Sequence, residues 1–285
     1  MAVIPSIEYE TMLQERLGAP TVWKEVCLVK YTDSGIWRNP YLTDSTVGTG
    51  IRGTGYSSTA VATVDDTVTI SAYIYSAEHI DDADLAQKSF SDFMEIADRM
   101  GKVLNERMET LMLAEHAALT DFGTLSIGLG GAATDAITVS ISNVKKIISS
   151  MKRVIRAAGG GDTMRSNGAF IIWREADYEL VELLASSEGF STADDVLKNG
   201  IKQGFPYLGV EHYSTSRNVA GHVFGGVKKA LAVGIVKSTY GKMKTIVNPV
   251  VSSAQISGVG LESRIDHKFK AWNNMVPILL DINVA

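Results

Sequence analysis

The residues that could do chemistry are few, and the clearest string among them is a run of glycines. Gly48, Gly50 and Gly53 match the G-x-G-x-x-G pattern of dinucleotide-binding proteins. In those proteins the pattern follows a strand and opens a helix, whose N-terminus holds the pyrophosphate. Here the flanking segments DST and TGYSSTAV show no helical pattern. We therefore expect no cofactor at these glycines, and a dinucleotide-dependent enzyme remains only a remote alternative.

The other reactive side chains are scattered along the chain. Cys27 is the only cysteine, which excludes a disulfide within the chain and a cysteine-rich zinc site. No two histidines stand at the i, i+4 spacing of a helical metal site, and the acidic neighbours of His79 suit a solvated segment better than a metal site. We predict no catalytic residue, no metal and no cofactor, and therefore no enzyme. The five histidines are His79, His116, His212, His222 and His267.

The composition is that of an acidic globular protein. Of the 285 residues 45% are hydrophobic and 21% are charged, and the formal net charge is -5. A chain without a long basic stripe does not suit tight DNA binding. No apolar run approaches the roughly 18 residues that a membrane helix needs. The start MAVIPSIEYE lacks the basic and apolar regions of a secretory signal, so we expect neither a membrane span nor secretion.

The first 41 residues resemble a loosely organised arm, interrupted by three prolines. We expect one short amphipathic helix, around residues 9–17. The arm carries four large aromatic residues, which need a surface to pack on. That surface is either the chain's own domain or a neighbouring subunit, and both readings stay open. The four are Trp23, Tyr31, Trp37 and Tyr41.

Residues 43–64 differ from the rest of the chain, since 13 of these 22 residues are Ser, Thr or Gly. Such a composition cannot fill a core and predicts an extended loop or the tip of a long hairpin. Residues 66–75 follow with strict alternation of apolar and polar side chains, which indicates one half-buried strand.

A long helix is the strongest expectation of the chain. Residues 85–118 place Met100, Leu104 and Met108 on one apolar face, and no proline interrupts them. Such a helix would be roughly 50 Å long. Gly101 is its one weak position, where we expect a bend.

The remaining elements alternate irregularly. We expect a glycine-rich loop at 123–134, a helix at 141–158 ended by three glycines, a buried strand at 169–173 and a further helix from Arg174. Strands dominate from Gly200 onward. This order indicates an α+β fold, not the regular βαβ alternation of a doubly wound sheet.

This order of elements resembles the major capsid proteins of tailed bacteriophages, which have the Hong Kong 97 fold. Residues 43–75 resemble the extended loop of that family, and residues 85–119 resemble its long spine helix. Two strings resemble the axial domain: NVKKIISSMKRVIRAAG followed by GAFIIWREADYELVELL, and GFPYLGVEHYSTSRNVAGHVFGGVKKALAVGIV. The string LESRIDHKFKAWNNMVPILLDINV resembles the closing strands that return to the peripheral domain.

The resemblance implies a division of the chain into five parts. They are an N-terminal arm (1–41), an extended loop (42–80), a peripheral domain with the spine helix (81–135), an axial domain (136–240) and the return strands of the peripheral domain (241–285).

The resemblance also implies a function. The protein would be a major capsid protein that assembles as hexamers and pentamers, in the cytoplasm of the host bacterium, into an icosahedral virion shell around the DNA genome. It would contact the packaged DNA weakly and without sequence specificity. Its other partners would be separate scaffolding and portal proteins, because no fused scaffolding extension precedes the arm.

In some members of that family, a lysine on the extended loop forms covalent cross-links, and the corresponding loop of this chain lacks a lysine. No lysine occurs between Lys30 and Lys88. We therefore expect a shell held by non-covalent contacts or by a cement protein.

A long helix, a protruding hairpin and an aromatic arm suit a subunit that lies across its neighbours, because an exposed hairpin edge invites pairing with another chain.

The alternatives are an encapsulin-like nanocompartment around a cargo enzyme and a β-rich adhesin or tail component, the latter disfavoured by the long helix. Six residues are expected to make contacts between subunits. They are Trp23, Trp37, Arg38, Arg52, Asp65 and Asp66.

Overall fold

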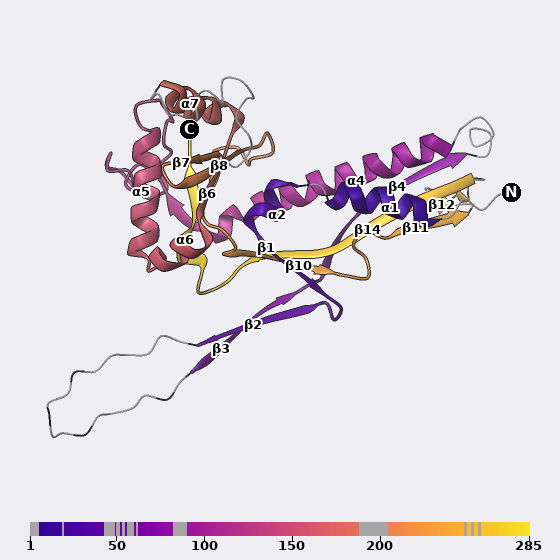
Figure 1. The fold of residues 1–285 in the computed structure, drawn as a ribbon, viewed down its shortest axis with the longest axis horizontal. Helices are drawn as coiled ribbons and strands as arrows, with labels where there is room; N and C mark the ends of the chain where they lie inside the picture. The colour runs from indigo at the N-terminus through magenta and orange to yellow at the C-terminus, as the bar shows by residue number, and fades with distance from the viewer. Residues whose placement is uncertain are drawn as a thin grey trace.

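A two-stranded hairpin projects from the body of the molecule, and two larger sheets organise that body (Figure 1). The computed structural model describes residues 6–18, 20–42, 62–81, 90–187, 205–247 and 258–285, with isolated positions between 49 and 60 and between 250 and 255. Most of the expected loop at 43–64 therefore lies outside the described residues. No described helix is both long enough and apolar enough to cross a membrane.

The first sheet has five strands built around one long strand, β14. The strand order is β1-β10-β14-β11, and β4 pairs with β14 as well. One edge of β14 pairs with β10 and then β11, while ten of its residues pair with β4 along the other edge. The strands are β1 (Leu28–Thr32), β4 (Ala72–Asp81), β10 (Leu231–Val236), β11 (Met243–Val247) and β14 (Gly258–Ala271).

The long helix α4 (Phe90–Leu113) packs on this sheet beside α1 (Ser6–Gly18), and both helices were expected (Figure 1). The expected apolar face is buried, with Met100 and Leu104 each 1% exposed. The described helix ends five residues before 118, and the 3-10 helix η1 (Ala114–Ala118) continues it.

Gly101 has a different role from the expected bend. The helix α4 continues through this position as a single element. A Cβ at position 101 would lie 2.9 Å from the Cβ of Arg16 on α1, closer than real Cβ atoms come. The glycine therefore permits the close approach of the two helices.

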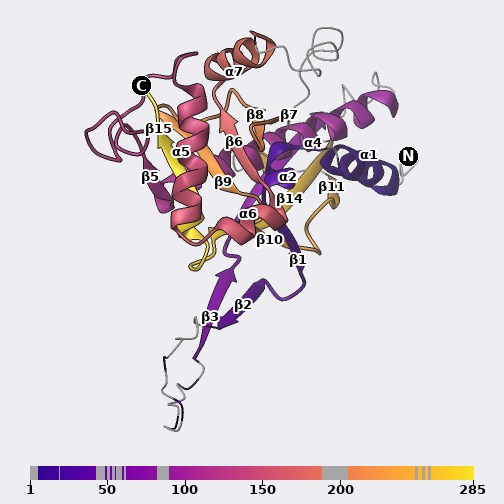
Figure 2. The ribbon, with the colours of Figure 1, turned by 60° about the vertical axis from the view of Figure 1, so that its left-hand side comes forward.

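The second sheet has six strands in the order β5-β15-β9-β6-β8-β7. Figure 2 shows α5 lying across it, with α6 and α7 nearby. The expected helices and the buried strand are present, and α6 is a further helix that begins at the third of the three glycines. The strands are β5 (Thr120–Phe122), β6 (Ala169–Trp173), β7 (Phe205–Tyr207), β8 (Val210–Ser214), β9 (His222–Val227) and β15 (Leu279–Asn283). The helices are α5 (Val144–Ala157), α6 (Gly161–Asn167) and α7 (Glu175–Ser187).

The expected strand at 66–75 is two strands in different sheets. The strand β3 (Thr63–Thr69) pairs with β2 (Ile36–Leu42), whereas β4 begins at Ala72 and joins the five-stranded sheet. Between them, the amide of Ile70 donates a hydrogen bond to the carbonyl of Gly35 at 2.9 Å. Alternation of side chains continues across the break, so the sequence pattern could not reveal it.

The two sheets also divide the chain differently from the expected boundary at 240/241. The strand β10 precedes that boundary but lies in the five-stranded sheet, and β15 follows it but lies in the six-stranded sheet. Residues 241–285 therefore contribute strands to both sheets. The end of the chain leaves β14, passes through η2 (Val276–Ile278) and pairs with β9 and β5 instead.

Candidate functional site

The projecting hairpin of β2 and β3 lies outside both larger sheets of its own subunit (Figure 1). Its strands pair only with each other within the described residues, and no residue of β2 is fully buried. Ile36 is 46% exposed and Leu42 is 64% exposed. A lone two-stranded hairpin is marginally stable in water, so its base needs an anchor.

A small apolar cluster supplies part of that anchor. Val68 on β3 is 1% exposed and packs with Ala232 and Trp272 of the body. Trp37 on β2 meets Trp272 edge to face, with ring centroids 4.7 Å apart. Such aromatic pairs add about 0.5–1.5 kcal/mol beyond the burial of their area. Trp37 therefore holds the hairpin to its own subunit.

A buried ion pair supplies the rest of the anchor. The carboxylate of Asp66 is 1% exposed and accepts hydrogen bonds from the Lys270 ammonium and, at 2.8 Å, from the amide of Asn273. The same ammonium donates to the carbonyl of Thr67 at 3.0 Å. The described contacts of Asp66 thus lie within its own chain, and its side chain has no free surface for a neighbouring subunit.

The other charged residues of the expected set lie on the outside of the hairpin. The Arg38 guanidinium and the Asp65 carboxylate lie 3.7 Å apart, with side chains 70% and 50% exposed. An ion pair this exposed contributes little to stability by itself. Arg52 is also exposed. All three side chains are available to a partner.

Trp23 lies away from the hairpin, on the short helix α2 (Val22–Val26). Its side chain is fully buried and meets Phe269 edge to face, with ring centroids 6.5 Å apart. This corrects the expectation that Trp23 contacts a neighbour, because no surface of its side chain is left to offer. Trp23 thus packs on its own domain. Trp37 also packs on its own domain but stays partly exposed, so its contact with a neighbour remains a prediction.

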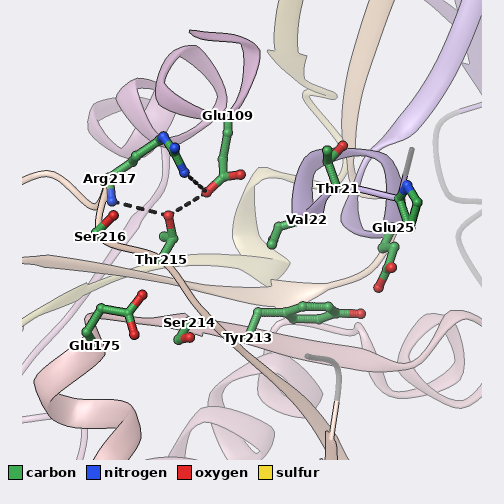
Figure 3. A pocket seen from close by; sticks show the side chains of 11 residues that line it. Thr21, Val22, Glu25, Glu109, Glu175, Tyr213, Ser214, Thr215, Ser216 and Arg217 are labelled. Carbon is green, nitrogen blue, oxygen red and sulfur yellow. Dashed lines mark hydrogen bonds and ion pairs between the residues drawn. The ribbon is translucent and has the colours of Figure 1, made fainter. Parts of the chain in front are cut away.

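An open hollow of about 520 Å³ lies where α2, α4, α7 and the end of β8 meet (Figure 3). Its polar side chains include the carboxylates of Glu25, Glu109 and Glu175 and the guanidinium of Arg217. Thr215 donates a hydrogen bond to Glu109, and Arg217 lies 3.9 Å from the same carboxylate. The three carboxylates outnumber the one cation, so the hollow suits a basic group.

Tyr213 lines the same hollow and is held in its neutral form. Burial, together with the carboxylates of Glu211 and Glu25, raises the pKa of its phenol. The hydroxyl donates a hydrogen bond to Glu211 at 2.8 Å. The residues of this hollow come from distant segments, so their spacing in the sequence gave no signal of the site.

A second grouping that the sequence did not indicate joins His116, His222 and Asp281. These side chains come from η1, β9 and β15, and 165 positions separate the first from the last. Two imidazoles and a carboxylate in contact could hold a metal ion, although no metal was expected from the sequence.

Comparison with known proteins identifies the fold. No protein-family model matches the sequence, and no curated protein matches it either. Solved structures do match over nearly the whole chain. The capsid of a native GTA particle has a TM-score of 0.63 at 9% identity, covering 92% of this chain and 89% of that one.

Two further structures agree. One from Mycobacterium phage Che8 has a TM-score of 0.61 at 12% identity, covering 92% of this chain and 96% of that one. A virus-like particle from Pyrococcus furiosus has a TM-score of 0.58 at 10% identity, covering 97% and 98%. The chain therefore has the capsid fold of these particles, and the expected Hong Kong 97-type fold is confirmed.

Proposed function

We propose that this chain is the major capsid protein of a tailed bacteriophage, which assembles with copies of itself into an icosahedral shell around the DNA genome. The observation that carries the proposal is a projecting hairpin on a capsid fold, anchored through β3 and without a fully buried residue along β2. An unpaired hairpin edge is a liability in a monomer and a contact surface in an assembly. The proposed role is structural, with no enzymatic step.

An encapsulin-like nanocompartment is the second candidate, because the match to a virus-like particle from Pyrococcus furiosus supports a closed shell of this fold whatever it encloses. Both candidates are closed shells, and they differ in what the shell encloses. The contents of purified particles separate them, because a phage head grown in its host contains DNA and a nanocompartment contains a cargo protein.

The partners follow from the phage-head proposal. The chain forms hexamers and pentamers in the cytoplasm of the host bacterium, with separate scaffolding and portal proteins, and becomes part of the virion. Because the chain has no lysine between Lys30 and Lys88, the shell is held by non-covalent contacts or by a cement protein. Contact with packaged DNA is weak and non-specific, in keeping with the net charge of -5.

The contacts between subunits are proposed to include Arg38, Arg52 and Asp65, the exposed charges of the hairpin and its loop. Arg52→Glu reverses the charge of an exposed side chain and should leave the subunit's fold intact. We expect the association constant of the affected contact to fall about tenfold, which corresponds to the loss of about 1.4 kcal/mol. Because the shell repeats this contact many times, the yield of assembled particles should fall at least as strongly.

The matched control is Arg165→Glu, the same change at an arginine that is 84% exposed on α6. Its particle yield, measured by sedimentation, should stay close to that of the wild type. If Arg52→Glu assembles with the same yield as the wild type, Arg52 is not one of the contacts between subunits. The shell proposal itself is tested separately, by assembly of the wild-type chain.

A further inference from the structure

Three side chains meet where the end of the long helix reaches the six-stranded sheet. His116 lies on η1, directly after α4, while His222 and Asp281 lie on the neighbouring strands β9 and β15. None of them belongs to the hairpin or to the hollow beside Glu109.

The geometry of this cluster is compact. The Nδ1 atom of His222 lies 3.0 and 2.9 Å from the two carboxylate oxygens of Asp281. The Nδ1 atom of His116 lies 3.3 Å from one of the same oxygens. The two imidazole rings face each other, with centroids 4.0 Å apart and planes inclined by 30°. One ligand atom from each residue lies within 4.8 Å of the other two.

The electrostatics of the cluster call for a cation. Asp281 is 3% exposed, and a buried carboxylate is costly unless a positive charge compensates it. Its ion-pair partners in the described part of the chain are the two histidines, which are uncharged in their neutral form.

We propose that His116, His222 and Asp281 bind one divalent transition-metal ion of the zinc type. The ligands are the two Nδ1 atoms and a carboxylate oxygen, and water takes the fourth position. Imidazole and carboxylate together suit zinc and its neighbours in the first transition row. A tetrahedral ion with bonds of about 2.0–2.1 Å holds its ligands about 3.3 Å apart, close to the observed separations of 3.3 and 2.9 Å.

An ion can reach this site from solvent. The side chains of His116 and His222 are 20% and 29% exposed, whereas that of Asp281 is 5% exposed. The Asp281 carboxylate therefore lies on the buried side of the site, and the two imidazoles lie on the side that faces solvent.

The bound ion would fasten three distant segments together. His222 and Asp281 are 59 positions apart, and His116 and Asp281 are 165 positions apart. Cross-links that close long loops stabilise the folded state strongly, and metal binding at such a site adds to the free energy of folding. The ion would fix the end of α4 against the six-stranded sheet, and so set how the two sheets of the subunit are joined.

The test is calorimetric titration of the full chain, stripped with EDTA, with zinc chloride at neutral pH. We expect one zinc per chain, and a rise in Tm of about 5 °C when free zinc exceeds its Kd about 100-fold. Cobalt(II) bound at the same site should give the visible absorption of a low-coordinate ion with nitrogen and oxygen ligands.

Three variants locate the binding. His222→Ala removes a partly exposed ligand and Asp281→Asn removes the charge at nearly constant shape, and both should lose the zinc and the Tm shift. His79→Ala removes an exposed histidine of β4 and should bind as the wild type does.

Two results would overturn the proposal: no saturable zinc binding by the stripped wild-type chain, or wild-type binding by a folded His222→Ala chain. If Asp281→Asn does not fold, His222→Gln replaces it as the second variant, and retained zinc binding there has the same meaning.

Discussion

Among single residues, His212 is the buried titratable group with the clearest consequence. Its side chain is fully buried in the six-stranded sheet. The indole Nε1 of Trp173 donates a hydrogen bond to His212 Nδ1 at 2.9 Å, and His212 Nε2 donates to the carbonyl of Tyr207 at 3.2 Å. Burial lowers the pKa of this imidazole to about 4. The ring is therefore neutral in the folded protein at neutral pH.

This shift makes the subunit sensitive to acid. The unfolded chain has an ordinary histidine with a pKa near 6.5 and binds the proton first, so stability falls as the pH drops from about 6.5 to about 4. The loss approaches about 3 kcal/mol in the free energy of unfolding. Denaturant titrations between pH 4 and 8 measure it, and His212→Gln should show a shallower pH dependence. An NMR titration that places the pKa of His212 near 6.5 would contradict this account.

The ion pair at the base of the hairpin gives a second prediction at this scale. Lys270→Met leaves the carboxylate of Asp66 buried without its cation, while the aliphatic part of the side chain is retained. We expect the free energy of unfolding to fall by about 2–3 kcal/mol. This loss is smaller than that for a fully buried ion pair, because the lysine is itself partly exposed. Lys244→Met, at an exposed position of β11, is the matched control and should change it by less than about 0.5 kcal/mol. Equal effects of the two changes would mean that the pair does not anchor the hairpin.

At the scale of elements, α4 packs on the five-stranded sheet through only one of its own faces. Leu104 is 1% exposed and its neighbour Val103 is 50% exposed. Leu104→Ala leaves a cavity and should lower the free energy of unfolding by about 2–5 kcal/mol, whereas Val103→Ala should cost less than about 0.5 kcal/mol. Chemical denaturation of the two variants gives both values. A similar cost at both positions would show that the helix is oriented differently.

Periodicity predicted most of the helices and strands because it reports which face of an element is buried. The helix α5, the strand β6 and the long helix α4 were all expected from this pattern. It does not report what the buried face packs against. For that reason the break between β3 and β4, the sheet to which β15 belongs and the role of Gly101 in admitting α1 could not be read from the sequence.

The candidate site was predictable only in part, for a related reason. Arg38 and Asp65 stood out as isolated charges in a segment poor in them, and the structure leaves both exposed. Asp66 stood out in the same way, and Trp23 stood out as a large aromatic residue of the arm, yet both are buried in their own chain. The zinc-type cluster and the acidic hollow each combine residues from distant segments, and a single sequence carries no signal of such contacts.

At the scale of the whole molecule, the hairpin of β2 and β3 projects from the body and pairs with no other described strand (Figure 1). No residue of β2 is fully buried within its own subunit. A subunit that leaves such a surface uncovered is suited to burying it against neighbours in a large assembly.

The shell proposal is tested most directly by electron microscopy of the purified chain. The protein is separated by size-exclusion chromatography and each fraction is viewed in negative stain. We predict hollow closed shells tens of nanometres across, or hexamers and pentamers that assemble into them. A chain that stays a monomer or dimer under all conditions, even with a scaffolding protein added, would contradict the proposed function.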